Sequence, residues 1–486
     1  MNRALRRMAI VVLAMFALLL AQVTRVQFID HDFYANNQYN GRVLIDQYSV
    51  PRGSIYAGDT LIAHSVDVGG SQLRYQREYP ESSTYANITG FISPTIGMNN
   101  LEQAENPVLT GEDSRFFFQR VRDTFTGEET LGGDLILSID PDVHQAAYQA
   151  LADSGVRGGI VMMEPQTGAV VAQASYPSWD PNEVASNDSA VAQEAWDALN
   201  DDDADPGVDR TRSNHAAPGS TFKTVVSAAL IRELGFEADT MVPAGNRYEP
   251  PNTQHVITNA SDQCPESELP LREAFARSCN TTFAQLCVDQ LEPDQLRGMA
   301  RDLGMGEEFA TPLPTVASDL GDIDDPALRA QSCIGQQDVR MTVMQNAMIA
   351  ATVANDGQRM EPNTVSEVRD SEGNTMDRQS SSRAGQVLTA AESQQMELIM
   401  RAVVEDGTGT NAAIDSHVVG GKTGTAENTD SDGNRRPNHG WFIGWAQDSD
   451  DSPAIAIAVY LANYGENASS EAADIAGDLM ERYLTD

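Results

Sequence analysis

The chain has 486 residues, which is enough for two or three domains with sizeable hydrophobic cores. It carries 71 acidic and 32 basic residues, and the formal net charge of −39 argues against binding nucleic acid or an anionic membrane surface through charge. The acidic residues are spread widely, with a local run at 201–205, as is typical of a solvated surface rather than of a metal site. We therefore expect neither a nucleic-acid partner nor a metal cofactor.

The N-terminus places Arg3, Arg6 and Arg7 before an uncharged stretch from Met8 to Val23. These roughly 16 apolar residues are fewer than the about 20 that a spanning helix needs, so a cleaved signal peptide is the alternative. Leucine, however, occupies the −3 position of the nearest cleavage site, Leu19-Leu20-Ala21. The preceding arginines favour a cytoplasmic N-terminus at 1–7 and a signal anchor at 8–24. We expect a single-pass protein of the cell membrane, with the bulk of the chain extracellular.

Residues 25–134 are polar and rich in turns, with short β-like runs at 42–45 and 72–75. They contain no cluster of acids and bases that would support chemistry of their own. We expect a separate N-terminal module with a scaffolding or dimerisation-like role.

The composition changes at residue 135, where a strand at 135–139 is expected to open a second domain, 135–486. The helices expected here are a stretch after Pro141 that runs through Leu151, and the ranges 221–234, 337–354 and 469–484. Two more are expected between 271 and 291, separated by a break near 278–280. The expected strands are a hairpin of 159–163 with 169–173, and a late set at 418–425, 441–446 and 454–462, with a long loop between the first two of that set. The acidic stretch 197–209 is expected to be a surface loop. Early and late strands with helices between them predict one α/β domain whose sheet joins distant segments.

Lysine is almost absent from this chain. Of its 32 basic residues only Lys223 and Lys422 are lysines, and the others are arginines. Arginine provides charge but keeps its proton, whereas a desolvated lysine can lose its proton. A general preference for arginine explains the scarcity, but it does not explain why both lysines complete recognisable motifs. We infer that a titratable amine is required at both positions.

Three short motifs carry the candidate chemistry. Ser220 and Lys223, at i and i+3, share a helix face, so a neutral lysine could remove the serine proton. Ser278 and Asn280 place a hydroxyl and a carboxamide between two helices, although either could be a simple helix cap. The third motif, 421–425, lies on an expected strand, where a glycine admits a ligand backbone. Each signal is weak alone, but together and in this order they are strong.

With these three motifs the sequence resembles the class B penicillin-binding proteins, in which Ser-x-x-Lys, Ser-x-Asn and Lys-Thr-Gly line one cleft. The closest likeness is to an actinobacterial and mycobacterial subgroup, and it extends over nearly the whole chain, including Arg52-Gly53-Ser54-Ile55 and Gly407-Thr408-Gly409-Thr410. The resemblance implies an α/β (α+β) transpeptidase domain with a central antiparallel sheet flanked by helices. A smaller, mostly β N-terminal module and a membrane anchor would precede it.

The resemblance also implies the reaction, a peptidoglycan D,D-transpeptidation without a cofactor. Ser220 would be acylated by D-Ala-D-Ala stem peptides or by β-lactam inhibitors, with Lys223 as its general base. Ser278 would pass a proton to the leaving D-alanine, Asn280 would hold the donor peptide or the Lys223 amine, and Lys422 would set the local field. The remaining implied roles are substrate binding by Thr423, Gly424 and Thr425, and an oxyanion hole from the backbone N–H groups of Ser220 and Thr425.

The cysteines Cys264, Cys279, Cys287 and Cys333 all lie in the part expected outside the cell, and an even number there indicates disulfides with three open pairings. No metal-type CxxC spacing is present, so a zinc site is not expected. By resemblance we expect Cys264 to pair with Cys279, closing a loop of about 16 residues and contributing on the order of 3 kcal/mol if the bond is unstrained.

Four alternatives share part of this chemistry. A class A β-lactamase needs a glutamate to activate water, but the nearest match to its signature has Trp196 at that position. A D,D-carboxypeptidase differs only in its acceptor, which the motifs do not specify, so it remains open as a side activity. A catalytically idle scaffold would not need the two lysines, and a penicillin sensor would need a longer cytoplasmic part. The resemblance finally implies a membrane glycosyltransferase partner of the SEDS type, since no glycosyltransferase module is present.

Overall fold

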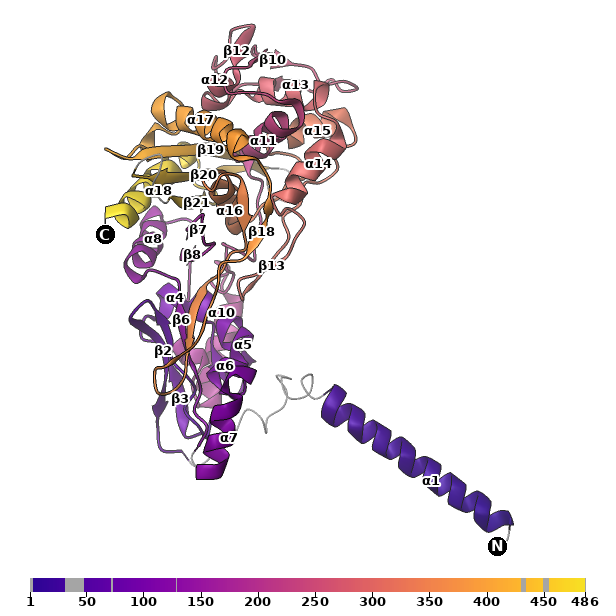
Figure 1. Cartoon of the computed structure of the whole chain (residues 1–486). Helices are drawn as coiled ribbons and strands as arrows, with labels where there is room; N and C mark the ends of the chain where they lie inside the picture. Colours follow the sequence, from indigo (N-terminus) through magenta and orange to yellow (C-terminus); the bar gives the residue numbers. More distant parts are fainter. Residues whose placement is uncertain are drawn as a thin grey trace.

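A computed structural model describes residues 3–30, 48–70, 73–127, 129–429, 434–448 and 454–485. The run expected to be β-like at 42–45 lies outside these residues. Beyond an isolated N-terminal helix, the chain forms two bodies built on separate sheets (Figure 1). The expected fold class, an antiparallel transpeptidase sheet flanked by helices and preceded by a smaller β-rich module, is confirmed.

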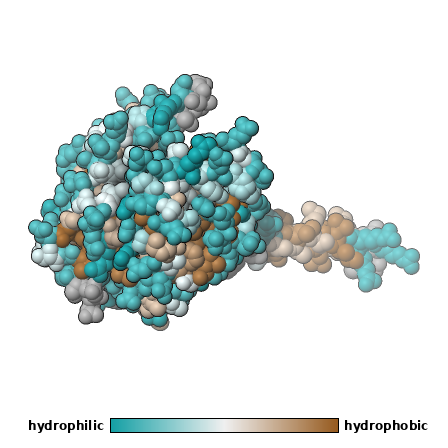
Figure 2. All heavy atoms as spheres, turned by 90° about the horizontal axis from the view of Figure 1, so that it is seen from above, coloured by the Kyte–Doolittle hydropathy of each residue, from teal (hydrophilic) through white to brown (hydrophobic). Residues whose placement is uncertain are grey.

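The N-terminal helix α1, Arg3–Thr24, has no buried side chain among those described and continues into a π-helical turn, Arg25–Ile29. The segment Arg6–Gln27 is long and apolar enough to cross a membrane. At 1.5 Å per residue its 22 residues span about 33 Å, which matches the hydrocarbon core of a bilayer of about 30 Å. Figure 2 shows its apolar middle and its hydrophilic tip. The helix is therefore longer than the uncharged stretch alone indicates, and it suggests a single-pass anchor.

The N-terminal module is built on a six-stranded sheet in the order β17-β16-β6-β1-β2-β3. Its strands are β1 Ile55–Ala57, β2 Thr60–Asp67, β3 Tyr75–Glu78, β6 Asp134–Leu137, β16 Val365–Arg369 and β17 Thr375–Arg378. Its helices are α4 Ser82–Thr89, α5 Asn100–Ala104, α6 Asn106–Leu109 and α7 Phe117–Thr126. The strand expected to open the second domain is thus β6, and it pairs in this sheet with β1 on one side and β16 on the other. The expected boundary at residue 134/135 therefore does not separate the two sheets.

A buried ionic cluster lies inside this module. The Glu102 carboxylate accepts hydrogen bonds from Arg52 Nε and Arg77 Nε, each at 2.6 Å, and all three side chains are almost completely buried. Arg52 also donates to Asn106 Oδ1, and Tyr79 OH donates to Glu102 Oε1 at 3.3 Å. Although burial raises the pKa of Glu102, the charges and hydrogen bonds of Arg77 and Arg52 outweigh it, and the net pKa is lowered.

The second body is built on a five-stranded sheet in the order β19-β20-β21-β7-β8, in which every neighbouring pair is antiparallel. The strands are β7 Gly158–Met163, β8 Val170–Tyr176, β19 Val418–Thr429, β20 Arg435–Gln447 and β21 Ile455–Leu461. The expected hairpin and the three late strands are confirmed. The long loop expected between the first two late strands is wrong, because β19 and β20 extend to Thr429 and from Arg435 as one long paired hairpin.

Both faces of this sheet are covered, so its strands are continuously apolar rather than alternating. Ile457 and Val459 of β21 pack into one core with α8, Pro141–Ser154, and α18, Ala468–Thr485. The alternate residues Ala456 and Ala458 face the other core, with α11, Lys223–Leu234, and α16, Val343–Val353. The remaining helices are α9 Pro181–Val184, α10 Ser189–Asp201, α12 Leu271–Ala276, α13 Asn280–Asp289, α14 Pro293–Asp302, α15 Pro326–Ser332 and α17 Ala390–Asp406.

Two further expected elements differ from the structure. The helix expected at 337–354 begins only at Val343, because Met341 forms a β-bridge with Ala216 and Thr342 caps the helix. The acidic stretch 197–209 is not a loop throughout, since α10 continues to Asp201. Asp209 at its other end is buried and forms an ion pair with Arg212 at 2.8 Å.

Candidate active site

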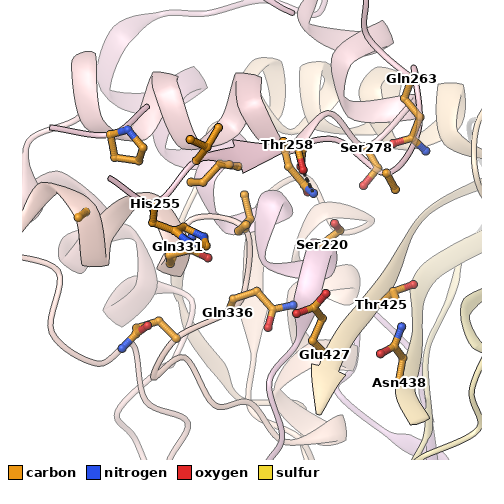
Figure 3. Close-up of a pocket in the computed structure, with 18 of the residues that line it drawn as sticks. Ser220, His255, Thr258, Gln263, Ser278, Gln331, Gln336, Thr425, Glu427 and Asn438 are labelled. Carbon is orange, nitrogen blue, oxygen red and sulfur yellow. Dashed lines mark hydrogen bonds between the residues drawn. The ribbon is translucent and has the colours of Figure 1, made fainter. Parts of the chain in front are cut away.

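The three motifs meet in one cleft of about 970 Å³ between strand β19 and the helical part of the domain. Figure 3 shows Ser220, Ser278 and Thr425 around the same space, although they come from a helical turn, an interhelical loop and a strand. Each side chain is carried by an element anchored in the core, so the site is held by packing on three sides.

Ser220 lies in the 3₁₀ turn Gly219–Phe222, which leads directly into α11 at Lys223. The α-helix thus begins two residues later than expected, but Ser220 and Lys223 remain one turn apart on the same face. Gly219 has a φ of 55°, a conformation that favours glycine, and its N–H donates to Gly335 O at 2.9 Å. The Ser220 hydroxyl makes no hydrogen bond to another described residue and lines the cleft, where it can meet a substrate.

Lys223 is completely buried, and its amine faces the second motif. Lys223 Nζ donates to Ser278 O at 2.7 Å and to Asn280 Oδ1 at 2.8 Å, and it lies 3.2 Å from Ser278 Oγ. Burial, together with the charge of Lys422, lowers the pKa of Lys223 well below its ordinary value. A neutral amine has two protons and one lone pair, so it can donate to the two carbonyl oxygens and keep its lone pair for a hydroxyl proton.

Lys422 is also completely buried and contacts the Ser278 hydroxyl. Its Nζ donates to Ser278 Oγ at 3.0 Å and to Thr423 O at 3.1 Å, and it lies over the Phe275 ring. Burial lowers the pKa of Lys422 to about 7. Both lysines of the chain therefore contact Ser278 Oγ, and both are held where their proton affinity is reduced.

Ser278 occupies a strained backbone position between α12 and α13. Its φ of 61° is unusual for a residue with a side chain, and it lets the carbonyl and the hydroxyl both face Lys223. The next residue, Cys279, precedes α13 and is joined by a disulfide to Cys264. A second disulfide joins Cys287 to Cys333. The first bond fixes the second motif to the loop that forms one wall of the cleft.

Strand β19 places the third motif against the 3₁₀ turn that carries Ser220. Thr423 Oγ1 lies 2.6 Å from Thr408 Oγ1, and Thr425 Oγ1 donates to Ser469 Oγ at 3.3 Å. A β-carbon on Gly424 would lie 2.6 Å from Pro218 O, and one on Gly219 would lie 2.4 Å from Thr425 O. This close approach brings the backbones of Ser220 and Thr425 together, as an oxyanion hole requires.

We expect Gly424→Ala to reduce acylation of Ser220 by about 10²–10³-fold, because the added carbon forces β19 away from the turn and would misplace the oxyanion hole expected there. Gly385→Ala is the matched control, since its β-carbon would meet no atom within 4 Å. The measurement is the rate at which a fluorescent penicillin labels each of the two variants. Equal rates for the two variants would contradict this geometry.

The cleft also contains residues that no sequence motif indicated. On the β-strand side these are Glu427, Arg435, Asn438 and Ser469, and on the helical side His255, Gln263, Gln331, Gln336 and Gln337 (Figure 3). Thr408 lies within a segment that the resemblance includes, but it had been given no role. The others are scattered over 215 positions of the chain between His255 and Ser469 and have no common spacing, so only the fold brings them together.

Two buried lysine amines contact one serine hydroxyl, and a second serine lines the same cleft, which is the arrangement expected of a serine acyl transferase. The chain belongs to the penicillin-binding protein transpeptidases. The profile of the "Penicillin binding protein transpeptidase domain" matches residues 158–481, and that of the "Penicillin binding protein A dimerisation domain" matches residues 52–135.

Among individual relatives, the chain is similar to the peptidoglycan D,D-transpeptidase PbpA of Mycolicibacterium smegmatis, at 36% identity over 99% of this chain and 97% of that protein. It is equally similar to PbpA of Mycobacterium tuberculosis, at 36% identity and the same coverage. The crystal structure of the M. tuberculosis protein has a TM-score of 0.83 at 34% identity, covering 89% of this chain and 99% of that one. Its ceftriaxone acyl-enzyme has a TM-score of 0.84 at 34% identity, covering 90% and 99%.

Proposed function

We propose that this protein is a peptidoglycan D,D-transpeptidase in which Ser220 attacks the D-Ala-D-Ala terminus of a stem peptide. The observation that carries the proposal is the contact of both lysines with Ser278 Oγ, since one of them, Lys223, lies one helical turn from Ser220. Inert structural lysines would rarely be buried together in a chain that otherwise uses arginine. The acyl-enzyme complexes of the M. tuberculosis protein with β-lactams support the same chemistry at this site.

In acylation, neutral Lys223 accepts the Ser220 proton as Oγ attacks the carbonyl carbon of the penultimate D-alanine. The backbone N–H groups of Ser220 and Thr425 stabilise the oxyanion, and Thr423 and Thr425 bind the terminal carboxylate. The proton then passes from Lys223 through Ser278 Oγ to the leaving amine of D-alanine. Cationic Lys422 donates to that hydroxyl and so favours its release of a proton.

Transfer of the acyl group reverses these steps with a different amine. An amine of a neighbouring stem peptide loses its proton to the Lys223–Ser278 pair and attacks the acyl-enzyme, which restores the free Ser220 hydroxyl and forms the cross-link. Among the described residues that line the cleft, the one carboxylate is Glu427, and it is paired with Arg435 at 2.8 Å. Trp196, at the position where a β-lactamase needs its glutamate, packs against Phe91 instead. These contacts favour slow hydrolysis of the acyl-enzyme.

The direct test is labelling with a fluorescent penicillin, in which wild type should form a stable adduct and Ser220→Ala should form none. Persistence of the label over hours distinguishes a transpeptidase from a β-lactamase, which releases it. Incubation with a stem pentapeptide and an amine acceptor should yield the cross-linked product rather than the hydrolysed tetrapeptide alone. Equal labelling of wild type and Ser220→Ala would refute the assignment.

The arrangement in the membrane follows from the same proposal. We infer a cytoplasmic N-terminus at 1–7, the anchor at 8–24, an N-terminal module at 25–134 completed by β6 and β16–β17, and the transpeptidase domain in the remainder. The catalytic body lies outside the cell, where the stem peptides are, and a SEDS-type glycosyltransferase in the same membrane supplies the glycan strands. Co-purification with such a polymerase, lost when α1 is exchanged for an unrelated anchor, would support this arrangement.

The pH dependence of acylation tests the different roles of the two lysines. Acylation should increase with pH as Lys223 loses its proton, and decrease again above about pH 7 as Lys422 loses its charge. Arginine keeps its proton, so Lys422→Arg should retain part of the activity and lose the decline at high pH. Second-order rates of penicillin acylation between pH 5 and about pH 9 would show this. If the acylation rate of Lys422→Arg declined at the same pH as that of wild type, the decline would be due to a group other than Lys422.

A further inference from the structure

An apolar helix face without a partner among the described residues lies on α7. Phe118, Val121 and Phe125, at i, i+3 and i+7, share one side of this helix. Phe118 is 83% exposed and Phe125 is 87% exposed, and the half-exposed Phe117 packs edge-on against Phe118. Single exposed apolar residues are ordinary, but a contiguous group of aromatic side chains marks an interaction surface.

The polar side of α7, in contrast, is attached to the protein. Asp123 is buried, and Arg120 donates through Nη1 to the carbonyl oxygens of Gly111 and Asp113 at 2.8 and 2.6 Å. Arg122, one turn from both Phe118 and Phe125, borders the apolar face and pairs with Glu372, in the turn between β16 and β17, at 3.1 Å. An amphipathic helix of a soluble body normally buries its apolar face, so this orientation is inverted. The inversion indicates that the outward face meets a surface other than water.

The position of α7 identifies that surface. α7 lies at the end of the molecule farthest from the helices around α12 and α13 (Figure 1). The chain re-enters the described structure at the same end, where the Tyr48 carbonyl accepts a hydrogen bond from the Tyr75 N–H at the start of β3. About 18 residues separate Ile29 from Tyr48, and they reach no farther than roughly 60–65 Å even when fully extended. The membrane that holds α1 is therefore within reach of this end.

We propose that the α7 apolar face, formed by Phe117, Phe118, Val121 and Phe125, inserts into the interfacial region of the membrane that holds α1. The protein is then attached to the bilayer at two points, and its N-terminal module is fixed against the lipid surface. Aromatic residues beside arginines are typical of helices that lie in the interface, and the insertion is driven by apolar burial rather than by the acidic surface. The proposal requires only that α1 is an anchor.

The match to a dimerisation domain at residues 52–135 includes α7, but the area of the α7 apolar face makes a second copy of the chain a less suitable occupant. The three phenylalanines and Val121 expose roughly 500 Å², given the 150–250 Å² that an aromatic side chain presents. A stable protein–protein interface buries about 800 Å² on each partner, with a polar rim around its apolar centre. The patch is therefore small for a dimer interface, whereas each aromatic ring that enters the lipid interface adds to binding independently.

The test uses the full chain reconstituted in phosphatidylcholine vesicles with a fluorophore on Thr124→Cys, an exposed position of α7. All four native cysteines are paired, so the label is specific. Nitroxide attached to lipid tails should quench this label at least threefold more than in the same chain with Phe118→Ser and Phe125→Ser. Because α1 keeps both proteins on the vesicle, lost quenching reports on α7 alone. Labelling of Ser220 by penicillin should be unchanged, which shows that the variant is folded.

A second label on Glu237→Cys, exposed in the turn after α11, provides the matched control and should not be quenched by lipid nitroxide in either background. Strong quenching of the α7 label by aqueous iodide, equal with and without the serine substitutions, would place this face in water and overturn the proposal. Shielding from both quenchers would place it under another protein and would also overturn it. Penicillin labelling is independent of these results, so a failure here leaves the catalytic assignment standing.

Discussion

Replacement of Lys223 by arginine is expected to reduce acylation of Ser220 by about 10³-fold, within the 10²–10⁴ that a positioned general base contributes. Arginine preserves the charge that the rest of the chain uses, but a guanidinium does not release its proton at working pH. The Lys223 amine is fully buried and contacts Ser278 and Asn280 at hydrogen-bond distance, so we expect it to transfer a proton rather than to supply surface charge. The measurement is the second-order rate of labelling by a fluorescent penicillin.

Two further variants separate the loss of the base from crowding of a buried site. Lys223→Met removes the amine without adding volume, and it should be about as inactive as Lys223→Arg. Arg232→Lys, on the same helix but paired with Asp302 at the surface, should label within about twofold of wild type, because a surface ion pair is worth at most about 1 kcal/mol. If Lys223→Met labelled within tenfold of wild type, a group other than Lys223 would be the base.

Replacement of Glu102 by glutamine is expected to lower the free energy of unfolding by about 3–5 kcal/mol, since it leaves Arg52 and Arg77 buried without their counter-charge. The control is Glu372→Gln, which removes an exposed carboxylate that pairs with Arg122 and should cost less than about 1 kcal/mol. Urea unfolding of both variants, followed by circular dichroism, gives the comparison. Similar midpoints for the two variants would show that the buried cluster contributes no more than a surface ion pair.

The same cluster predicts the behaviour of the protein in acid. The folded state holds the pKa of Glu102 below the ordinary value of 4.5, so its stabilisation is complete above that pH. It is lost as the pH falls through the lower folded-state value, because the carboxylate must then be protonated between two arginines. The stability difference between wild type and Glu102→Gln should accordingly shrink with acidification below pH 4.5 and remain constant above it.

The sequence was informative wherever chemistry depends on residue type at short spacing. Ser220 with Lys223, Ser278 with Asn280, and Lys422 with Thr423 were each found as local patterns, and the fold brings the three pairs into one cleft. The late strands were also predictable, because a sheet covered on both faces produces uninterrupted apolar runs. The expectation that the three motifs share one cleft came from the family resemblance, because no local pattern indicates that residues 223, 278 and 422 lie together.

Other features could not be read from local patterns because they depend on pairing between distant segments. The expected start of the second domain at residue 135 followed a change in composition, but β6 finds its partners in β1 and in β16, which lies more than 200 residues later. Ser469 and Asn438 join the cleft only through the register of β20 and the start of α18. The 3₁₀ turn at Ser220 was likewise missed, since helical propensity does not distinguish it from the first turn of an α-helix.

The β16–β17 hairpin gives the protein a mechanical property. The chain leaves the transpeptidase domain after Asn363, adds two strands to the N-terminal sheet, and returns to pair β18, Arg383–Gln386, with β15, Gln358–Met360. The backbone thus passes between the two bodies more than once, with hydrogen-bonded strands at the crossing, so a single hinge does not join them. A tilt of the N-terminal module would therefore be transmitted to the transpeptidase domain and would change the direction in which its cleft opens.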